Sequence, residues 1–321
     1  MTYSVGGLIQ ATDYNGFVST TAGANVNATW STSSNSAGYG QTALATVSAS
    51  GTVTATQWAS LVNTIASMAN HQGTAITARS APTAGTLISV LSAVNTDITN
   101  CYNNRANAVA VGTQYTGWTG TNSLTAGRGA GAWTITFTNT VSFASANAAR
   151  YFFNAGGLIK LDTSKTATGA TGDPEWNDLA NNLCGDIYFS GLGTAHTIAG
   201  TSYTGTTKIG GTGVPNTLST TTGFYALTPG AAATIIYKQF ADTAPYTSNF
   251  IQHSVALDAT SSVLTFTTLW SASDGDPITG GTASSGATPG TAPTTICTYF
   301  PPSTTYLTNT WGTPTVAATT A

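Results

Sequence analysis

The stretch WTITFTNTVSF, residues 133–143, decides the fold class. Ile135, Phe137, Val141 and Phe143 alternate with Thr and Ser, so their apolar side chains fall on one face of an extended chain. A strand that is buried on one face and wet on the other is typical of an antiparallel sheet. Thr suits such a surface because its β-branched side chain is stiff and carries a hydroxyl group.

Similar runs continue along the chain and predict an antiparallel β-sandwich or jelly-roll-like domain over residues 111–321. Further strands are expected at residues 158–161, 187–189, 235–240, 250–257 and 263–270. Turns are expected at Gly156-Gly157 and at residues 259–262. Residues 274–296, rich in Gly, Ser and Pro, are expected to form a long surface loop.

The first third of the chain has a helical period and predicts a helical segment over residues 1–110. One helix is expected at residues 54–71, opened by a capping box of Thr54 and Gln57, and a second follows it. Asp13 is expected to cap a shorter helix upstream. The apolar seam of the two main helices is formed by Trp58, Leu61, Val62, Ile65, Leu87, Leu91, Val94 and Ile98. This seam fits a helical hairpin with its own core and, equally well, an oligomer interface. The fold class expected for the whole chain is α+β, mainly β.

The composition excludes several classes of protein. Only 6% of the 321 residues are charged, against about 25% in an average soluble domain, while about a fifth of the chain is Thr. The net charge of −3 and the scattered Lys and Arg leave no basic stripe for nucleic acid. Ten per cent aromatic residues argue against disorder.

The sequence predicts neither membrane insertion nor secretion. No run reaches the roughly 18 apolar residues that a membrane span needs, and Met1 to Asp13 lacks the pattern of a signal peptide. Cys101, Cys184 and Cys297 lie far apart, so we expect three buried thiols rather than disulfides or a metal site.

Catalytic groups are sparse, and no common catalytic motif is present. The histidines are His71, His196 and His253, on separate expected elements. His71 is expected to interact with the dipole at the end of its helix. The chain is therefore predicted not to be an enzyme and to need no cofactor.

Two groups of acidic residues are candidates for binding a cation. Asp173, Glu175 and Asp178 follow the pattern of a helix start, with a cation or sugar site as the alternative. Asp274 and Asp276 lie in the expected long loop, where turn formation is favoured over calcium binding.

Aromatic residues in Gly- and Thr-rich surroundings are candidates for stacking on sugars. The candidate glycan contacts are Tyr115, Trp118, Tyr203 and Tyr225. In a chain so poor in charge, most aromatic side chains are expected to lie in the core or in subunit contacts.

Several segments resemble virion structural proteins of marine tailed phages, especially those that infect cyanobacteria. The segments are residues 7–15, Trp30, residues 38–41, 55–63, 70–72, 149–157 and 300–307, with Asn309, Trp311 and Gly312. Residues 190–295 have no counterpart in that group. The resemblance implies a non-enzymatic virion component, associated with a tail or fibre, which is assembled in the host cytoplasm and released by lysis.

Such a component is expected to associate with copies of itself, as a trimer, and with other virion proteins. Two alternatives remain open. One is a surface adhesin that binds a host glycan, and the other is a capsid decoration protein.

Overall fold

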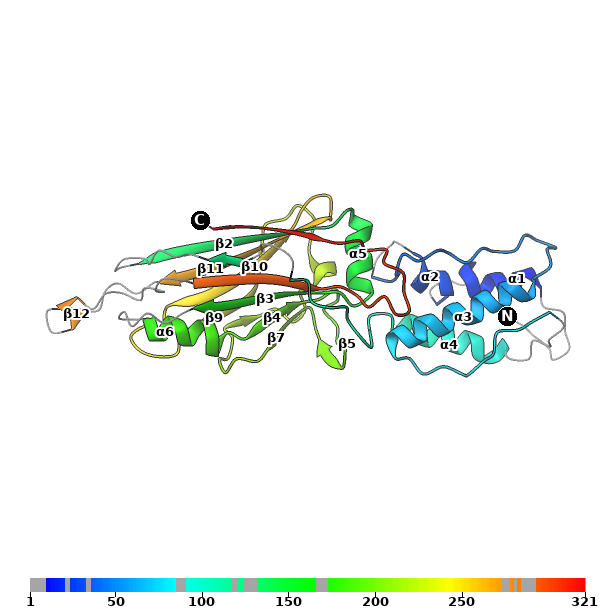
Figure 1. Ribbon diagram of the computed structural model, residues 1–321, viewed down its shortest axis with the longest axis horizontal. Coiled ribbons are helices and arrows are strands. Elements are labelled where there is room, and N and C mark those ends of the chain that lie inside the picture. The colour runs from blue at the N-terminus through cyan, green and yellow to red at the C-terminus, as the bar shows by residue number, and fades with distance from the viewer. Residues whose placement is uncertain are drawn as a thin grey trace.

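The N-terminal helices and the β-strands occupy opposite ends of an elongated molecule (Figure 1). The structure is a computed structural model, which describes residues 10–20, 24–32, 36–84, 91–116, 121–123, 132–165, 173–272, 278–279, 282–283 and 293–320. Helix accounts for 26% and strand for 30%, with N-terminal helices followed by two packed antiparallel sheets. The expected fold class, α+β and mainly β with a sandwich, is confirmed.

The helical module comprises four helices at one end of the molecule. They are α1 (Ala11–Asn15, extended by a π-helical turn, Gly16–Thr20), α2 (Val26–Trp30), α3 (Ala55–Gln72) and α4 (Leu91–Asn103). The predicted capping box is present, because Thr54 accepts a hydrogen bond from the Gln57 amide, at 3.3 Å, and the Gln57 side chain accepts from the Thr54 amide, at 2.8 Å. Gly73 ends α3 with a φ of 71°, which suits a residue without a Cβ.

The predicted cap of the first helix is wrong by one turn. Gln10 is the N-cap of α1, and Asp13 lies inside the helix, where its carboxylate accepts a hydrogen bond from the Gln10 amide at 3.2 Å. An acidic side chain in the first turn is as favourable for the helix dipole as one at the cap.

The sandwich consists of a five-stranded and a six-stranded antiparallel sheet. The first has the strand order β1-β14-β3-β4-β7 and the second β15-β2-β11-β10-β9-β8. The strands of the first sheet are β1 (Thr121–Ser123), β14 (Pro293–Phe300), β3 (Leu158–Lys165), β4 (Asp186–Phe189) and β7 (Thr206–Ile209). Those of the second are β15 (Thr315–Thr320), β2 (Trp133–Ser142), β11 (Val263–Ala272), β10 (Phe250–Leu257), β9 (Thr234–Phe240) and β8 (Thr217–Leu218).

Smaller elements complete the chain. Two short hairpins are formed by β5 (His196–Ile198) with β6 (Thr201–Tyr203) and by β12 (Ile278–Thr279) with β13 (Thr282–Ala283). Helix α5 (Ala146–Asn154) lies at the end of the sandwich that faces the helical module (Figure 1). Helix α6 (Asp173–Asp178) continues into a π-helical turn, Leu179–Leu183. The expected loop at 274–296 is wrong at its end, because residues 293–296 begin β14, which is paired with β3 along its whole length.

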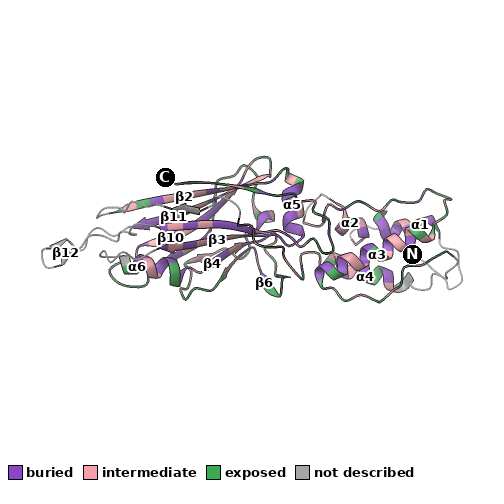
Figure 2. Cartoon of the chain, viewed as in Figure 1, coloured by how far each residue is buried: buried purple, intermediate pink, exposed green. Residues whose placement is uncertain are grey.

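Aromatic side chains form the core between the two sheets. Phe189 of β4 meets Phe266 of β11 edge to face, with ring centroids 5.4 Å apart. Trp176 of α6 stacks on Trp270 of β11 at 5.7 Å and tilts against Trp133 at 5.0 Å. Figure 2 shows buried residues running through both sheets and along α3. Area removed from water by these large side chains is the main source of stability in so uncharged a chain.

A joint of four residues, Gly38–Gln41, connects the helical module to the sandwich. Asn154 at the end of α5 donates a hydrogen bond to the Gly38 carbonyl at 2.8 Å. The Gln41 side chain pairs with the backbone of Thr308, donating to its carbonyl at 2.8 Å and accepting from its amide at 2.9 Å. The joint thereby binds an early segment of the chain to a late one.

Candidate functional site

The predicted oligomer seam is buried within a single chain. The members with side chains buried in α3 and α4 are Trp58, Leu61, Ile65, Val94 and Ile98. Val62 is half-buried, Leu87 lies outside the described residues, and so does the side chain of Leu91. The helical module uses these residues as its own core, so a second copy is not needed to cover them. The interface at this seam stays a prediction.

Tyr115 lines a groove of about 480 Å³. Its ring stacks on that of Tyr299, with centroids 4.8 Å apart and planes 11° apart. Pro301, Asn309 and Trp311 are among the other lining residues. Tyr299 and Trp311 are each 2% exposed, so half-buried Tyr115 is the ring of this trio that a sugar could contact, with Asn309 as a hydrogen-bonding neighbour.

Two of the other candidate glycan contacts, Tyr203 and Tyr225, do not line this groove. Tyr203 is buried beside Leu158 and Ile198. The hydroxyl group of Tyr225 donates to Asn154 Oδ1 at 2.8 Å, and burial raises the pKa of this phenol. Trp118 lies outside the described residues. Of the three candidates that the structure describes, Tyr115 alone lines the groove.

The three histidines lie apart and are all buried. Burial lowers the pKa of His71 to about 4 and that of His253 to about 3, and it also lowers the pKa of His196. The expected dipole interaction of His71 is wrong, because an imidazole with this pKa is neutral near pH 7 and its ring instead packs edge-on against Tyr39. His253 Nδ1 is 2.8 Å from Thr268 Oγ1.

The three cysteines are free and buried, as expected. Burial raises the pKa of the Cys101 and Cys184 thiols to about 12 and raises that of Cys297 as well. Thiols with raised pKa values are poor nucleophiles, because the thiolate is the reactive form. Packing accounts for all three.

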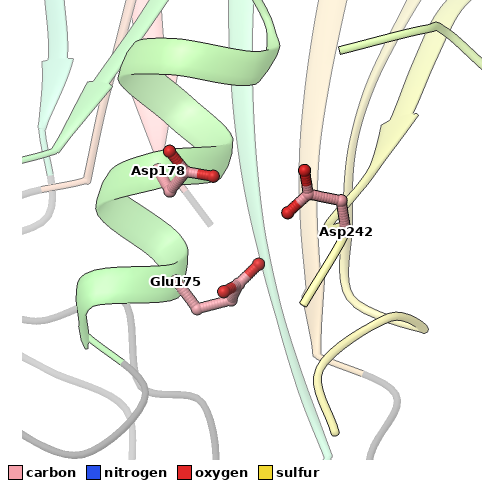
Figure 3. A group of neighbouring side chains, drawn as sticks. All are labelled: Glu175, Asp178 and Asp242. Atoms are coloured by element: carbon pink, nitrogen blue, oxygen red, sulfur yellow. The ribbon is translucent and has the colours of Figure 1, made fainter. Parts of the chain in front are cut away.

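Glu175, Asp178 and Asp242 form an acidic cluster at the end of the sandwich far from the helical module (Figures 1 and 3). One carboxylate oxygen from each lies within 4.8 Å of the other two, and among the described residues this is the one group of three possible metal ligands. Figure 3 shows Glu175 and Asp178 on one side of α6 and its extension, with Asp242 pointing back toward them. Burial raises the pKa of Glu175; hydrogen bonds from Thr243 oppose this and the two aspartates add to it.

The cluster differs from the acidic group expected from the sequence. Glu175 and Asp178 are three residues apart on a helix, so they share a face. Asp242 follows β9, and only the fold brings it to α6. The side chain of Asp173 is outside the described residues, as are Asp274 and Asp276.

Comparisons of the chain with protein-family models, with curated proteins and with solved structures give no match. Within the described residues, no helix is both long and apolar enough to cross a membrane. The fold defines a class of architecture, a helical module followed by an antiparallel β-sandwich, and the assignment of a function depends on the chain's own residues.

Proposed function

We propose that the chain is a non-enzymatic structural subunit of a tailed-phage virion, associated with the tail or a fibre and assembled with copies of itself. The layout of the molecule carries this proposal. A helical module lies at one end, a β-sandwich at the other, and the joint fixes one to the other (Figure 1). A subunit of this form can dock through one end and present the other.

The chemistry of the described side chains supports a structural role. The histidines and cysteines, which most often supply acid–base and nucleophilic groups, are used in packing and hydrogen bonds. Strand-rich subunits held by backbone pairing and apolar contacts need few ion pairs, in keeping with 6% charged residues.

Particle composition tests this proposal directly. Virions purified from cells infected with the encoding phage should contain the chain at a fixed stoichiometry, and the isolated chain should have the native mass of an oligomer, which we propose to be a trimer. A chain that is absent from washed particles would refute the virion role. A strictly monomeric chain at all concentrations would refute self-association.

A second candidate function is glycan binding, and the stacked pair of Tyr115 and Tyr299 in its groove favours it. On a glycan array, Tyr115→Ala should abolish binding that the full chain shows. The control is Tyr203→Phe, since Tyr203 is buried away from the groove. Equal binding by both variants, or none by the unaltered chain, would exclude this function.

A further inference from the structure

Glu175 has an unusual environment for a carboxylate. It is the only glutamate of the chain, and it is 8% exposed. Thr243 donates hydrogen bonds to this carboxyl group, but its buried Oε1 atom has no hydrogen-bond partner in the described part of the chain. Buried polar atoms nearly always have a partner, because leaving one without a partner is costly. A bound ligand would supply the partner that Oε1 lacks.

The charges around Glu175 indicate the sign of that ligand. Asp178 and Asp242 lie beside it, and one carboxylate oxygen from each of the three residues lies within 4.8 Å of the other two. Among the described residues, the ion pairs of Arg79 and Lys160 are made with Asp97, Asp162 and Asp186, and none of these belongs to the cluster. Three carboxyl groups this close repel one another when ionised, so a cation between them would relieve the repulsion and satisfy Oε1.

Rigid elements hold the three groups in place. Trp176, next to Glu175, is buried between Trp133 and Trp270, which fixes the first turn of α6. On the other side, the Ala241 amide donates to the Asn249 carbonyl at 2.9 Å and closes the connection between β9 and β10 just before Asp242. Packing and hydrogen bonding therefore fix the backbone segments that carry the carboxylates.

We propose that Glu175, Asp178 and Asp242 bind one calcium ion. Calcium takes oxygen ligands at about 2.3–2.6 Å, so two oxygens on opposite sides of the ion lie about 5 Å apart. One oxygen of each carboxylate lies within 4.8 Å of the other two, so all three can reach one ion at that ligand distance. Water fills the remaining coordination positions.

The bound ion would join two parts of the sandwich. Helix α6 and its extension pack beside β3, β9 and β10, and Asp242 belongs to the connection between β9 and β10. A calcium ion would tie the helix to that connection at the end of the sandwich far from the helical module (Figure 1). This site is independent of the proposed virion role and of the groove at Tyr115.

Calorimetric titration of the full chain tests the site. After chelator treatment, CaCl₂ and, separately, MgCl₂ are titrated into the unaltered chain and into Glu175→Gln, Asp242→Asn and Asp13→Asn. Asp13→Asn is the matched control, because Asp13 is an acidic helix residue in the helical module. Three carboxylates completed by water should give one calcium ion per chain with a Kd of about 10⁻⁴ to 10⁻³ M.

The variants distinguish this cluster from other acidic residues. Glu175→Gln and Asp242→Asn should weaken calcium binding at least about tenfold, or about 1.4 kcal/mol, while Asp13→Asn binds as the unaltered chain does. Because Asp242 is exposed, its variant keeps the test valid even if Glu175→Gln fails to fold. No saturable calcium binding by the unaltered chain would overturn the proposal, and so would unchanged affinity in Asp242→Asn.

Discussion

Tyr39→Phe tests how far the helical module depends on one buried hydroxyl group. Tyr39 is fully buried, and its hydroxyl group accepts a hydrogen bond from Gln72 Nε2 and donates one to the Arg105 carbonyl, each at 2.8 Å. The substitution removes one oxygen atom and leaves both partners in place. Burial also raises the pKa of this phenol, so the group is neutral and the change alters no charge near pH 7.

The expected loss follows from the surroundings of the two partners. Gln72 is 5% exposed, so its amide loses a partner that water cannot replace, at about 1–3 kcal/mol. The Arg105 carbonyl belongs to a half-buried residue that water reaches, so we take the net value of a hydrogen bond, about 0.5–1.5 kcal/mol. Together they predict a free energy of unfolding lower by about 1.5–4.5 kcal/mol.

Urea denaturation with linear extrapolation measures the change. The matched control is Tyr306→Phe, because Tyr306 is 40% exposed and water can serve its hydroxyl group. We expect the control to stay within about 0.5 kcal/mol of the unaltered chain. If Tyr39→Phe loses no more than the control, the reasoning about the buried hydrogen bonds is wrong.

Three further predictions concern acid, backbone strain and salt. Burial lowers the pKa values of His71 and His253 to about 4 and about 3, below the usual value of about 6.5. As the pH falls, the unfolded chain therefore takes up protons before the folded chain does, and the free energy of unfolding should fall below about pH 6.5. A flat profile in urea denaturation between about pH 7 and pH 5 would contradict this. Gly40→Ala should lower the free energy of unfolding by about 2–4 kcal/mol, because φ is 68° and the new methyl group would overlap the Tyr151 ring. Gly210→Ala, with a φ of 72° but open space around it, should lower the free energy of unfolding by about 1–2 kcal/mol in the same assay. Equal losses would exclude the overlap at Gly40. Thermal unfolding should shift little on adding about 1 M NaCl, where the Debye length is about 3 Å, because 6% of the residues are charged. A large drop in the midpoint would show that charge pairs matter more than burial.

The sequence predicted elements whose own side chains carry the pattern. Helix α3 has both its apolar stripe and its capping box within residues 54–72, so local chemistry suffices to find it. Strand β2 alternates buried and half-buried side chains as the Thr-rich pattern requires. In both α3 and β2, the apolar residues that define the sequence pattern are also the residues that pack into the core.

Strands that depend on their neighbours were not predicted. Strand β15, Thr315–Thr320, has small and polar residues with no apolar alternation, and its pairing with β2 makes it a strand. Strand β14 begins with Pro293 and Thr residues that read as a continuation of the Gly-rich loop, yet it lies between β1 and β3. Long-range backbone pairing leaves little trace in a local sequence pattern.

The acidic cluster was half predicted for a similar reason. Helical spacing places Glu175 and Asp178 on one face, which the sequence shows. Asp242 reaches them only because the π-helical extension of α6 packs beside β9, and neither residue type nor spacing predicts that contact. Burial of Glu175 follows from the same packing, so its orphaned oxygen is visible only in the fold.

The pairing of Gln41 with Thr308 has a consequence for biosynthesis. The helical module is translated long before residue 308 leaves the ribosome, so it emerges first, and Gln41 cannot pair with Thr308 until the end of translation. Strand β2 likewise has to wait for β15 to cover its free edge. A copy whose translation stops before residue 308 therefore lacks the hydrogen bonds between Gln41 and Thr308, and an assembly that depends on a fixed angle between the two ends would exclude it.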